Sequence, residues 1–298
     1  MTRFETTPAR SAGVPAMILV LAVIWGLSIP VTKLGLETLP PMTLTALRFG
    51  AALPPLFLLS TRHRLPMPAL SRVALLGLVG VGLGQLAQTL GIEGASASVG
   101  AILSATIPVF VVLFAALRLR QRVTPRQMLG LLAAFAGIAL VASGAGGGTD
   151  AATTSVAGVA WMLVSSVAIA FYYVWSVELT RAYGAAAVAS WSTLAGFLAL
   201  LPFAAWEASR QPVEPTLGAL AVAAYLGVFV TAAGLHLWLR LLERVTAAVA
   251  ASVQYLHPII GIAVSAAMFG DALGPHFAAG VALILGGLAL IVAPGRRR

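Results

Sequence analysis

The sequence predicts an all-α polytopic membrane protein of about ten transmembrane helices, arranged as two five-helix repeats of opposite orientation. Three observations support this fold class. The composition is too apolar for a soluble domain, the second half of the chain repeats the first at a constant spacing, and arginine is distributed unevenly between alternate loops.

The composition identifies the solvent of this chain as a lipid bilayer. Of its 298 residues, 60% are hydrophobic and 9% are charged, whereas soluble domains carry roughly 25% charged residues. The absence of cysteine excludes disulfides, thiolate chemistry and cysteine-based metal sites. A net charge of +9 would suit nucleic acid, but the arginines are scattered over short loops, which a membrane explains better.

Apolar segments of about 20 residues, the length that a span needs, follow one another along the chain. The first begins too close to the second, and is too long, to be a cleaved signal peptide. The Gly-, Ala- and Thr-rich residues 144–155 form a predicted linker. The predicted spans lie near 15–36, 41–60, 71–91, 95–118 and 125–143, and then near 156–178, 185–206, 215–238, 246–269 and 275–293.

The second half of the chain matches the first after a shift of 150 positions, without a gap. This shift places Pro258 over Pro108 and Trp175 over Trp25. Chance identities are expected among apolar residues, but not among glycines, prolines and a tryptophan held in one register. We interpret the chain as a duplication, with repeats at 1–143 and 156–298. The same register pairs Pro275 with Pro125, Gly280 with Gly130, Gly287 with Gly137, Gly227 with Gly77 and Gly234 with Gly84.

The loops predict the orientation of the spans. Arginines cluster in the loops of one side, whereas the loops of the other side hold Arg210 and most of the acidic residues. The positive-inside rule therefore places both termini in the cytoplasm and the linker in the periplasm. Both termini on one side require an even number of spans. Five spans per repeat then make the second repeat enter from the opposite face, which predicts an inverted repeat.

Inverted repeats around one pseudo-twofold axis favour a transporter, because exchange of their conformations gives alternating access to a site near the midplane. The first predicted helix also carries the sequence WGLSIPVTK at 25–33, and Arg48-Phe49 follows early in the second. These residues resemble the WG-x-x-F-x-x-x-K motif and the next signature of the EamA-type drug/metabolite transporters, with Ile29 in place of Phe. Within that family the chain is most similar to YddG-like amino-acid exporters. The resemblance implies a five-plus-five inverted repeat and export of small metabolites across a bacterial inner membrane.

Polar and aromatic residues at helical spacing indicate a substrate path. Gln254, His257 and Pro258 share one face of the ninth predicted span, and Ser104 and Pro108 lie on the matching face of the fourth. Polar side chains are costly in hydrocarbon, which favours positions facing protein or water. Interhelical hydrogen bonding and core packing are the alternatives, and the glycines are interpreted mainly as packing positions. Predicted substrate contacts are Trp25, Gln88, Ser104, Tyr172, Trp175, Trp238, Gln254 and His257.

Two further pairs have expected roles. Pro108 and Pro258 each remove a backbone donor within a span, so we expect kinks that belong either to a gate or to a static bend. Lys33 and Arg48 lie toward the outer ends of the first two spans. They either extend to the headgroups or, as the family resemblance implies, attract a carboxylate at the outer mouth.

The predicted function is export of small amphipathic metabolites, in particular amino acids including aromatic ones. A multidrug exporter for cationic drugs and a lipid flippase of the same fold remain alternatives. An intramembrane enzyme is disfavoured because no nucleophile–base pair, paired carboxylates or metal cluster occurs at membrane depth. We expect no cofactor and no metal. The expected partners are a small-molecule substrate and the bilayer but not nucleic acid, with the protein acting as a monomer or a dimer.

Overall fold

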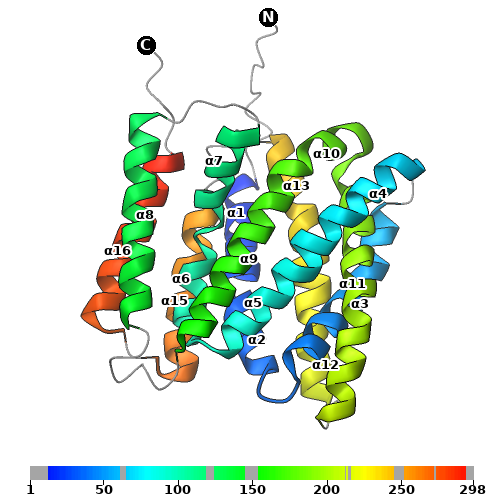
Figure 1. The fold of residues 1–298 in the computed structure, drawn as a ribbon, viewed down its shortest axis with the longest axis horizontal. Helices are drawn as coiled ribbons and strands as arrows, with labels where there is room; N and C mark the ends of the chain where they lie inside the picture. Colours follow the sequence, from blue (N-terminus) through cyan, green and yellow to red (C-terminus); the bar gives the residue numbers. More distant parts are fainter. Residues whose placement is uncertain are drawn as a thin grey trace, which may run out of the picture.

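The computed structural model describes residues 13–60, 65–118, 124–144, 154–211, 213, 216–244, 252–271 and 273–292. Within these ranges the chain is an all-helical bundle (Figure 1). In the first half its helices are α1 (Val14–Gly26), α2 (Ser28–Gly35), α3 (Pro41–Leu59), α4 (Met67–Leu76), η2 (Gly77–Leu83), α5 (Gly84–Glu93), α6 (Ala97–Ser104), α7 (Ile107–Arg118) and α8 (Pro125–Gly144). In the second half they are α9 (Val156–Trp175), α10 (Val177–Tyr183), α11 (Ala185–Arg210), α12 (Leu217–Ala224), η4 (Tyr225–Ala233), α13 (Gly234–Arg244), α15 (Ser252–Phe269) and α16 (Pro275–Val292).

The protein is a multi-pass membrane protein. Among the described residues, 7 helices are long and apolar enough to cross a membrane, and three shorter apolar helices lie at Pro125–Val141, Leu256–Phe269 and Pro275–Ile291. Large apolar side chains such as Leu58, Phe203 and Phe229 are exposed on the outside of the bundle, where lipid rather than water is the matching solvent. These helices overlap the ranges predicted from hydropathy. Residues 246–251 of the ninth predicted span and most of the predicted linker at 144–155 lie outside the described residues.

Several helices extend past the predicted ends, because an apolar window locates only the part of a helix that lies in hydrocarbon. The predicted span 156–178 continues through α10 to Tyr183, where Gly184 with φ 82° ends it. That backbone conformation is readily available to glycine and strained for other residues. Likewise α11 continues to Arg210 and α13 to Arg244.

The two described ends of the chain lie on one face of the bundle. α1 begins, and α16 ends, at the top of Figure 1, whereas α2 and α12 reach the bottom. We call the face where α1 begins the terminal face, and the opposite face the distal face.

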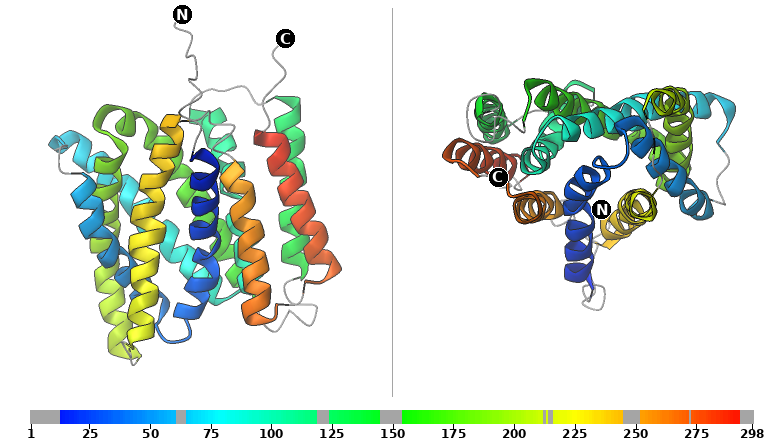
Figure 2. Two further views of the ribbon diagram at one scale, coloured as in Figure 1. Left: turned by 180° about the vertical axis from the view of Figure 1, so that it is seen from behind. Right: turned by 90° about the horizontal axis from the view of Figure 1, so that it is seen from below.

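α8 and α16 pair closely at one end of the molecule (Figures 1 and 2). A Cβ on Gly130 would lie 2.6 Å from the carbonyl oxygen of Gly287, and one on Gly137 would lie 2.8 Å from that of Gly280. Glycine therefore permits this backbone approach. The shift of 150 positions pairs Gly130 with Gly280 and Gly137 with Gly287. Exchanging each glycine for its equivalent in the other repeat therefore turns the contact Gly130–Gly287 into the contact Gly280–Gly137, so the two contacts are reciprocal. Reciprocity of this kind is what a twofold axis imposes.

The third span of each half, α4–η2–α5 in the first and α12–η4–α13 in the second, also packs against the other half through glycines. Gly227 of η4 leaves room for the backbone of α3 at Arg48, and Gly77 of η2 leaves room for the backbone of α11 at Ser192. About two turns further along, Gly234 meets Trp25 of α1, and Gly84 meets Ile169 of α9. The glycines predicted to be packing positions are therefore in close interhelical contact.

Both of these third helices change from α- to π-helical hydrogen bonding at matching positions. η2 covers Gly77–Leu83 and η4 covers Tyr225–Ala233, which overlap after the shift of 150 positions. π-helical segments are rare and recur at functional sites. The side chains around η2 and η4 are therefore candidates for a functional site.

The fourth span (α6 and α7) and the ninth span (α15) differ in their structure near the proline. The fourth is interrupted between α6 and α7 at Ala105–Thr106, just before Pro108, whereas α15 remains helical through Pro258. At the interruption the hydroxyl of Thr106 donates to Leu103 O at 2.7 Å and lies 3.1 Å from Ser166 Oγ of α9. These bonds satisfy polar groups that the break would otherwise leave unpaired in the membrane.

Candidate functional site

Arg48 is a buried cation at the contact between the two halves of the chain. It lies about two turns into α3, and only 8% of it is exposed. Its Nε donates to Thr231 Oγ1 of η4 at 3.1 Å. Among the described residues no carboxylate pairs with it, because the ion pair found there joins Arg118 to Glu178. A buried charge without a counter-ion is costly, so the guanidinium is suited to an anionic guest.

The local structure of η4 holds Thr231 in place. The Thr231 hydroxyl donates to Leu226 O, five residues earlier, at 2.9 Å, and can therefore accept from Arg48. Gly227 lets η4 approach the α3 backbone at Arg48, where any side chain would collide. Glycine and the π-helical segment together bring this hydroxyl to the guanidinium.

An aromatic pair meets the neighbouring residue of η4. Trp25 of α1 donates its indole N–H to Val230 O at 3.2 Å, and its ring lies 5.6 Å from that of Trp238 on α13, tilted by 45°. Trp25 thus contacts the residue that precedes Thr231, and Trp238 packs against Trp25. Rings of this kind contribute large apolar contact areas and can stack on another aromatic ring.

A second polar contact fixes the register of α5 relative to α3 along the bundle axis. Thr45 Oγ1 and Thr89 Oγ1 form a hydrogen bond of 2.9 Å. One turn from Thr89, the side-chain oxygen of Gln85 is buried and has no hydrogen-bond donor among the described residues. Neither Thr231 nor Gln85 was predicted to be a substrate contact, although Gln85 forms a polar pair at helical spacing with Thr89.

The ninth span, α15, packs with its backbone against α1 close to Trp25. A Cβ on Gly26 would lie 2.9 Å from His257 O and 2.8 Å from Ile260 Cβ, so α15 packs against α1 next to Trp25. The half-buried His257 has Nδ1 3.2 Å from Val253 O. Pro258 is buried in the same helix. The side chain of Gln254 lies outside the described residues.

The ammonium group of Lys33 is bound by backbone carbonyl groups of the protein. Its ammonium group donates to Ile92 O at 2.9 Å, Glu93 O at 3.1 Å and Ala95 O at 2.8 Å. All three of its hydrogens can thus be used on carbonyls at the carboxyl end of α5, where a cation is favoured by the helix dipole. Lys33 connects α2 to α5, and its described hydrogen bonds do not involve Arg48.

Other predicted contacts lie in different surroundings. Ser104 is buried and donates to Ala101 O at 2.7 Å, and Gln88 is half-buried on α5. Tyr172 OH lies 3.0 Å from Ser192 Oγ. Trp175 stacks on Phe171 at 4.3 Å and meets Phe114 at 5.6 Å. The structure therefore groups Trp25, Trp238, Arg48 and the α15 backbone, and it places Tyr172 and Trp175 with a separate set of α7, α9 and α11 residues.

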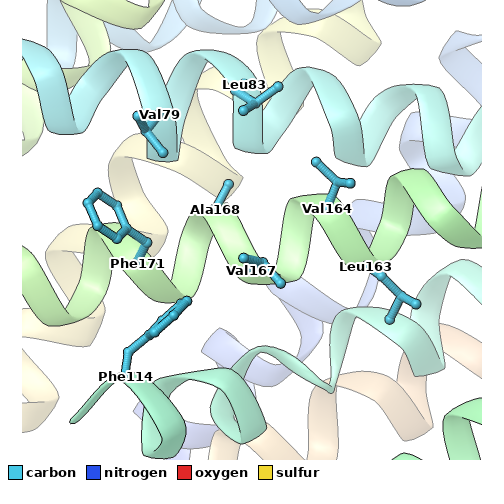
Figure 3. Close-up of a pocket in the computed structure, with 8 residues that line it drawn as sticks. All are labelled: Val79, Leu83, Phe114, Leu163, Val164, Val167, Ala168 and Phe171. Carbon is cyan, nitrogen blue, oxygen red and sulfur yellow. The ribbon is translucent and has the colours of Figure 1, made fainter. Parts of the chain in front are cut away.

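Phe114 and Phe171 also line a cavity of about 470 Å³ between η2, α7 and α9 (Figure 3). Its lining is apolar throughout, so it offers no partner to a carboxylate or an ammonium group. Sequence analysis did not predict this cavity. The lining residues are Val79, Leu83, Phe114, Leu163, Val164, Val167, Ala168 and Phe171.

Two carboxylates connect the halves at the distal face. Glu207 of α11 accepts from the backbone N–H groups of Met42 at 3.2 Å and Thr43 at 2.8 Å, at the start of α3. Asp271, which precedes α16, accepts from Ser98 N at the start of α6 at 2.8 Å. Both acids cap helix N-termini, where negative charge is favoured.

Comparison with known proteins places this architecture in a family. A model of the EamA-like transporter family matches residues 14–143 and again residues 156–293. A probable terminal-alkyne amino-acid exporter of Streptantibioticus cattleyicolor is 30% identical over 295 residues, covering 94% of each chain. An uncharacterized transporter of Archaeoglobus fulgidus is 26% identical over 270 residues, covering 90% of this chain and 94% of the relative.

The Escherichia coli inner membrane transporter YedA is 26% identical over 264 residues, covering 85% of this chain and 82% of YedA. One solved crystal structure superposes with a TM-score of 0.63 at 19% identity, covering 94% of this chain and 97% of its own, which shows a shared fold. The family model covers nearly the whole described chain in two matches. The chain therefore belongs to the EamA-like transporter family.

Proposed function

We propose that this transporter exports small amphipathic metabolites, in particular amino acids including aromatic ones, from the bacterial cytoplasm by alternating access. The observation that carries the substrate class is the buried Arg48, which has a hydroxyl partner and no acidic partner among the described residues. A carboxylate guest would supply the missing counter-charge. Arginine binds carboxylates through paired N–H donors.

The aromatic pair supports an amphipathic guest. Trp25 bonds to the η4 residue next to Thr231, and Trp238 packs against Trp25, so a guest with its carboxylate at Arg48 can place an apolar side chain against this pair. The exporter of Streptantibioticus cattleyicolor, whose name specifies an amino-acid substrate, is consistent with this substrate class.

We further propose that residues 1–143 and 156–298 are inverted five-helix repeats joined by a periplasmic linker. The reciprocal glycine contacts of α8 with α16, and of η2 and η4 with the opposite halves, support a pseudo-twofold relation. The matching π-helical segments support it as well. Two inverted repeats can exchange conformations, which produces outward-open and inward-open states around one site.

The polar contacts between the halves indicate which face is closed. At the distal face, Glu207 and Asp271 cap helices of the other half, and Glu207 is buried. Toward the terminal face, the described polar contacts between the halves are the hydrogen bond from Ser190 Oγ to Leu56 O at 2.9 Å and the ion pair of Arg118 with Glu178, whose side chains are 42% and 66% exposed. Exposed ion pairs contribute little. We therefore assign the distal face as the closed one and, with the arginine-rich loops inside, the state as closed to the periplasm.

Reporter tags test the proposed topology. Tags at either terminus should be cytoplasmic, and a tag inserted at Gly146–Thr154 should be periplasmic. A cytoplasmic linker would refute the inverted-repeat arrangement.

Growth assays test the substrate class. Cells that overproduce the protein should resist toxic amino-acid analogues, because export lowers the internal concentration of each analogue. Resistance to hydrophobic cations without resistance to the analogues would support multidrug efflux, and lipid translocation without either would support a flippase. Cells that carry an empty vector provide the control.

A further inference from the structure

Gln85 presents a buried acceptor that no residue in the described part of the chain satisfies. Its Oε1 has no hydrogen-bond donor, and the other three atoms in that condition among the described residues are serine hydroxyl oxygens, of Ser98, Ser165 and Ser265. A hydroxyl can rotate to adapt to its surroundings, whereas an amide oxygen only accepts. Leaving such an acceptor unpaired destabilises the empty protein, and a donor on a bound guest would remove that cost.

The packing of α3 against α5 puts Gln85 at the level of Arg48. The two helices run in opposite directions (Figure 1), and the hydrogen bond between Thr45 and Thr89 fixes their register. Arg48 lies three residues after Thr45, and Gln85 lies four residues before Thr89. Both steps are about one helical turn toward the same face of the molecule. The two side chains therefore occupy one level while sharing no hydrogen bond.

The two groups have complementary chemistry. Arg48 presents N–H donors beyond the bond that its Nε makes to Thr231, and Gln85 presents an acceptor. An α-amino acid carries an acceptor, its carboxylate, and a donor, its ammonium group, on one carbon. We infer that Gln85 accepts a hydrogen bond from the substrate's ammonium group while Arg48 binds the substrate's carboxylate. This inference rests on the proposed function and adds the residue that recognises the amine.

This arrangement predicts how the transporter distinguishes related compounds. Removal of the amino group from the substrate should leave Gln85 unpaired, and removal of the carboxylate should leave Arg48 unpaired. Phenylalanine should therefore compete better than 3-phenylpropionate and better than phenethylamine. Because a hydrogen bond to a charged group is among the stronger ones, each comparison should differ by about tenfold or more.

The test compares Gln85→Leu with wild type in proteoliposomes, with labelled phenylalanine as substrate and the two analogues as competitors. Gln85→Leu should reduce the preference for phenylalanine over 3-phenylpropionate by about tenfold, while the preference over phenethylamine stays. Gln211→Leu is the matched control, because the same substitution at this exposed residue should leave both preferences unchanged.

Thermal unfolding of the ligand-free protein separates recognition from a structural role. If Oε1 of Gln85 forms a hydrogen bond only when substrate is bound, Gln85→Leu should raise the melting temperature of the empty protein, since an unsatisfied polar group has been removed. A lower melting temperature, or failure of both Gln85→Leu and the nearly isosteric Gln85→Met to fold, would show a structural partner and overturn the inference.

The outcomes also separate this inference from the proposed function. Transport of phenylalanine by wild type, with the amine preference intact in Gln85→Leu, would refute the role of Gln85 and leave amino-acid export standing. Absence of phenylalanine transport by wild type, with transport of another guest class, would refute both.

Discussion

At the scale of single residues, the account depends on a cation in an apolar environment. Arg48 is buried, is bonded to Thr231 and has no described acidic partner. A residue retained only for stability would be expected to have a counter-charge, because the desolvation of an unpaired ion opposes folding. Lys33 provides the contrast, since three backbone carbonyls satisfy its ammonium group.

Arg48→Gln should therefore separate binding from stability. We expect the apparent affinity for amino acids to fall by about tenfold or more, because a charge-assisted carboxylate contact is lost. We expect the melting temperature of the empty protein to stay or rise, because a buried charge has been removed. Substrate-dependent thermal shift measures both quantities.

Arg72→Gln is the matched control, since Arg72 is exposed on α4. A large loss of stability in Arg48→Gln with unchanged substrate affinity would show that Arg48 serves the fold alone.

At the scale of helices, close approach of backbones replaces the hydrophobic effect as the main source of specificity. Lipid is as apolar as leucine, so helices in a membrane associate through packing and through polar contacts. The α8–α16 pair illustrates this, because four glycines bring the two backbones together.

Adjacent glycines on α16 give a matched test of that packing. A Cβ on Gly287 would lie 2.5 Å from Gly130 O, whereas a Cβ on Gly286 would meet nothing within 4 Å. We expect Gly287→Ala to destabilise the protein by about 1–3 kcal/mol through overpacking. Gly286→Ala should be neutral or slightly stabilising, since alanine favours helix. Equal melting temperatures for the two variants would contradict the observed α8–α16 contact.

Much of the helical layout was predictable from sequence, because hydropathy marks the spans and glycine, proline and tryptophan mark the repeat. The π-helical segments were not, because a shift of the hydrogen-bond register leaves no periodic signal in side chains. Gln88 was selected because it shares a face with Gly84 and Gly91, and that glycine face packs on α9. Gln85 was missed because its significance depends on the register of α3 against α5. The polar spacings of Thr45 with Arg48, and of Gln85 with Thr89, were the available signal.

At the scale of the whole molecule, the two faces differ in how the halves are joined. Carboxylate caps from Asp271 and from the buried Glu207 join them at the distal face, whereas the ion pair that joins them at the terminal face is exposed. Alternating access requires the distal contacts to break in each cycle. The difference predicts that a covalent bond at the distal face stops transport.

The chain contains no cysteine, so an introduced pair can be tested against a clean background. Ser98→Cys combined with Asp271→Cys joins positions whose backbone nitrogen and carboxylate lie 2.8 Å apart. Oxidation of the pair should abolish transport, and reductant should restore it, because the distal face can open only after the bond breaks. The single Asp271→Cys variant controls for the loss of the Asp271 cap, and the single Ser98→Cys variant controls for the change at Ser98. Full transport by protein shown by mass to be cross-linked would contradict closure at this face.

The central claim is that this transporter moves amino acids through a site built around Arg48. Its most direct test is counterflow in proteoliposomes that contain purified wild-type protein and are preloaded with unlabelled phenylalanine. The account predicts accumulation of labelled phenylalanine well above that in protein-free liposomes, and little accumulation of a labelled hydrophobic cation. Phenylalanine accumulation equal to that of protein-free liposomes, together with clear accumulation of the cation, would contradict it.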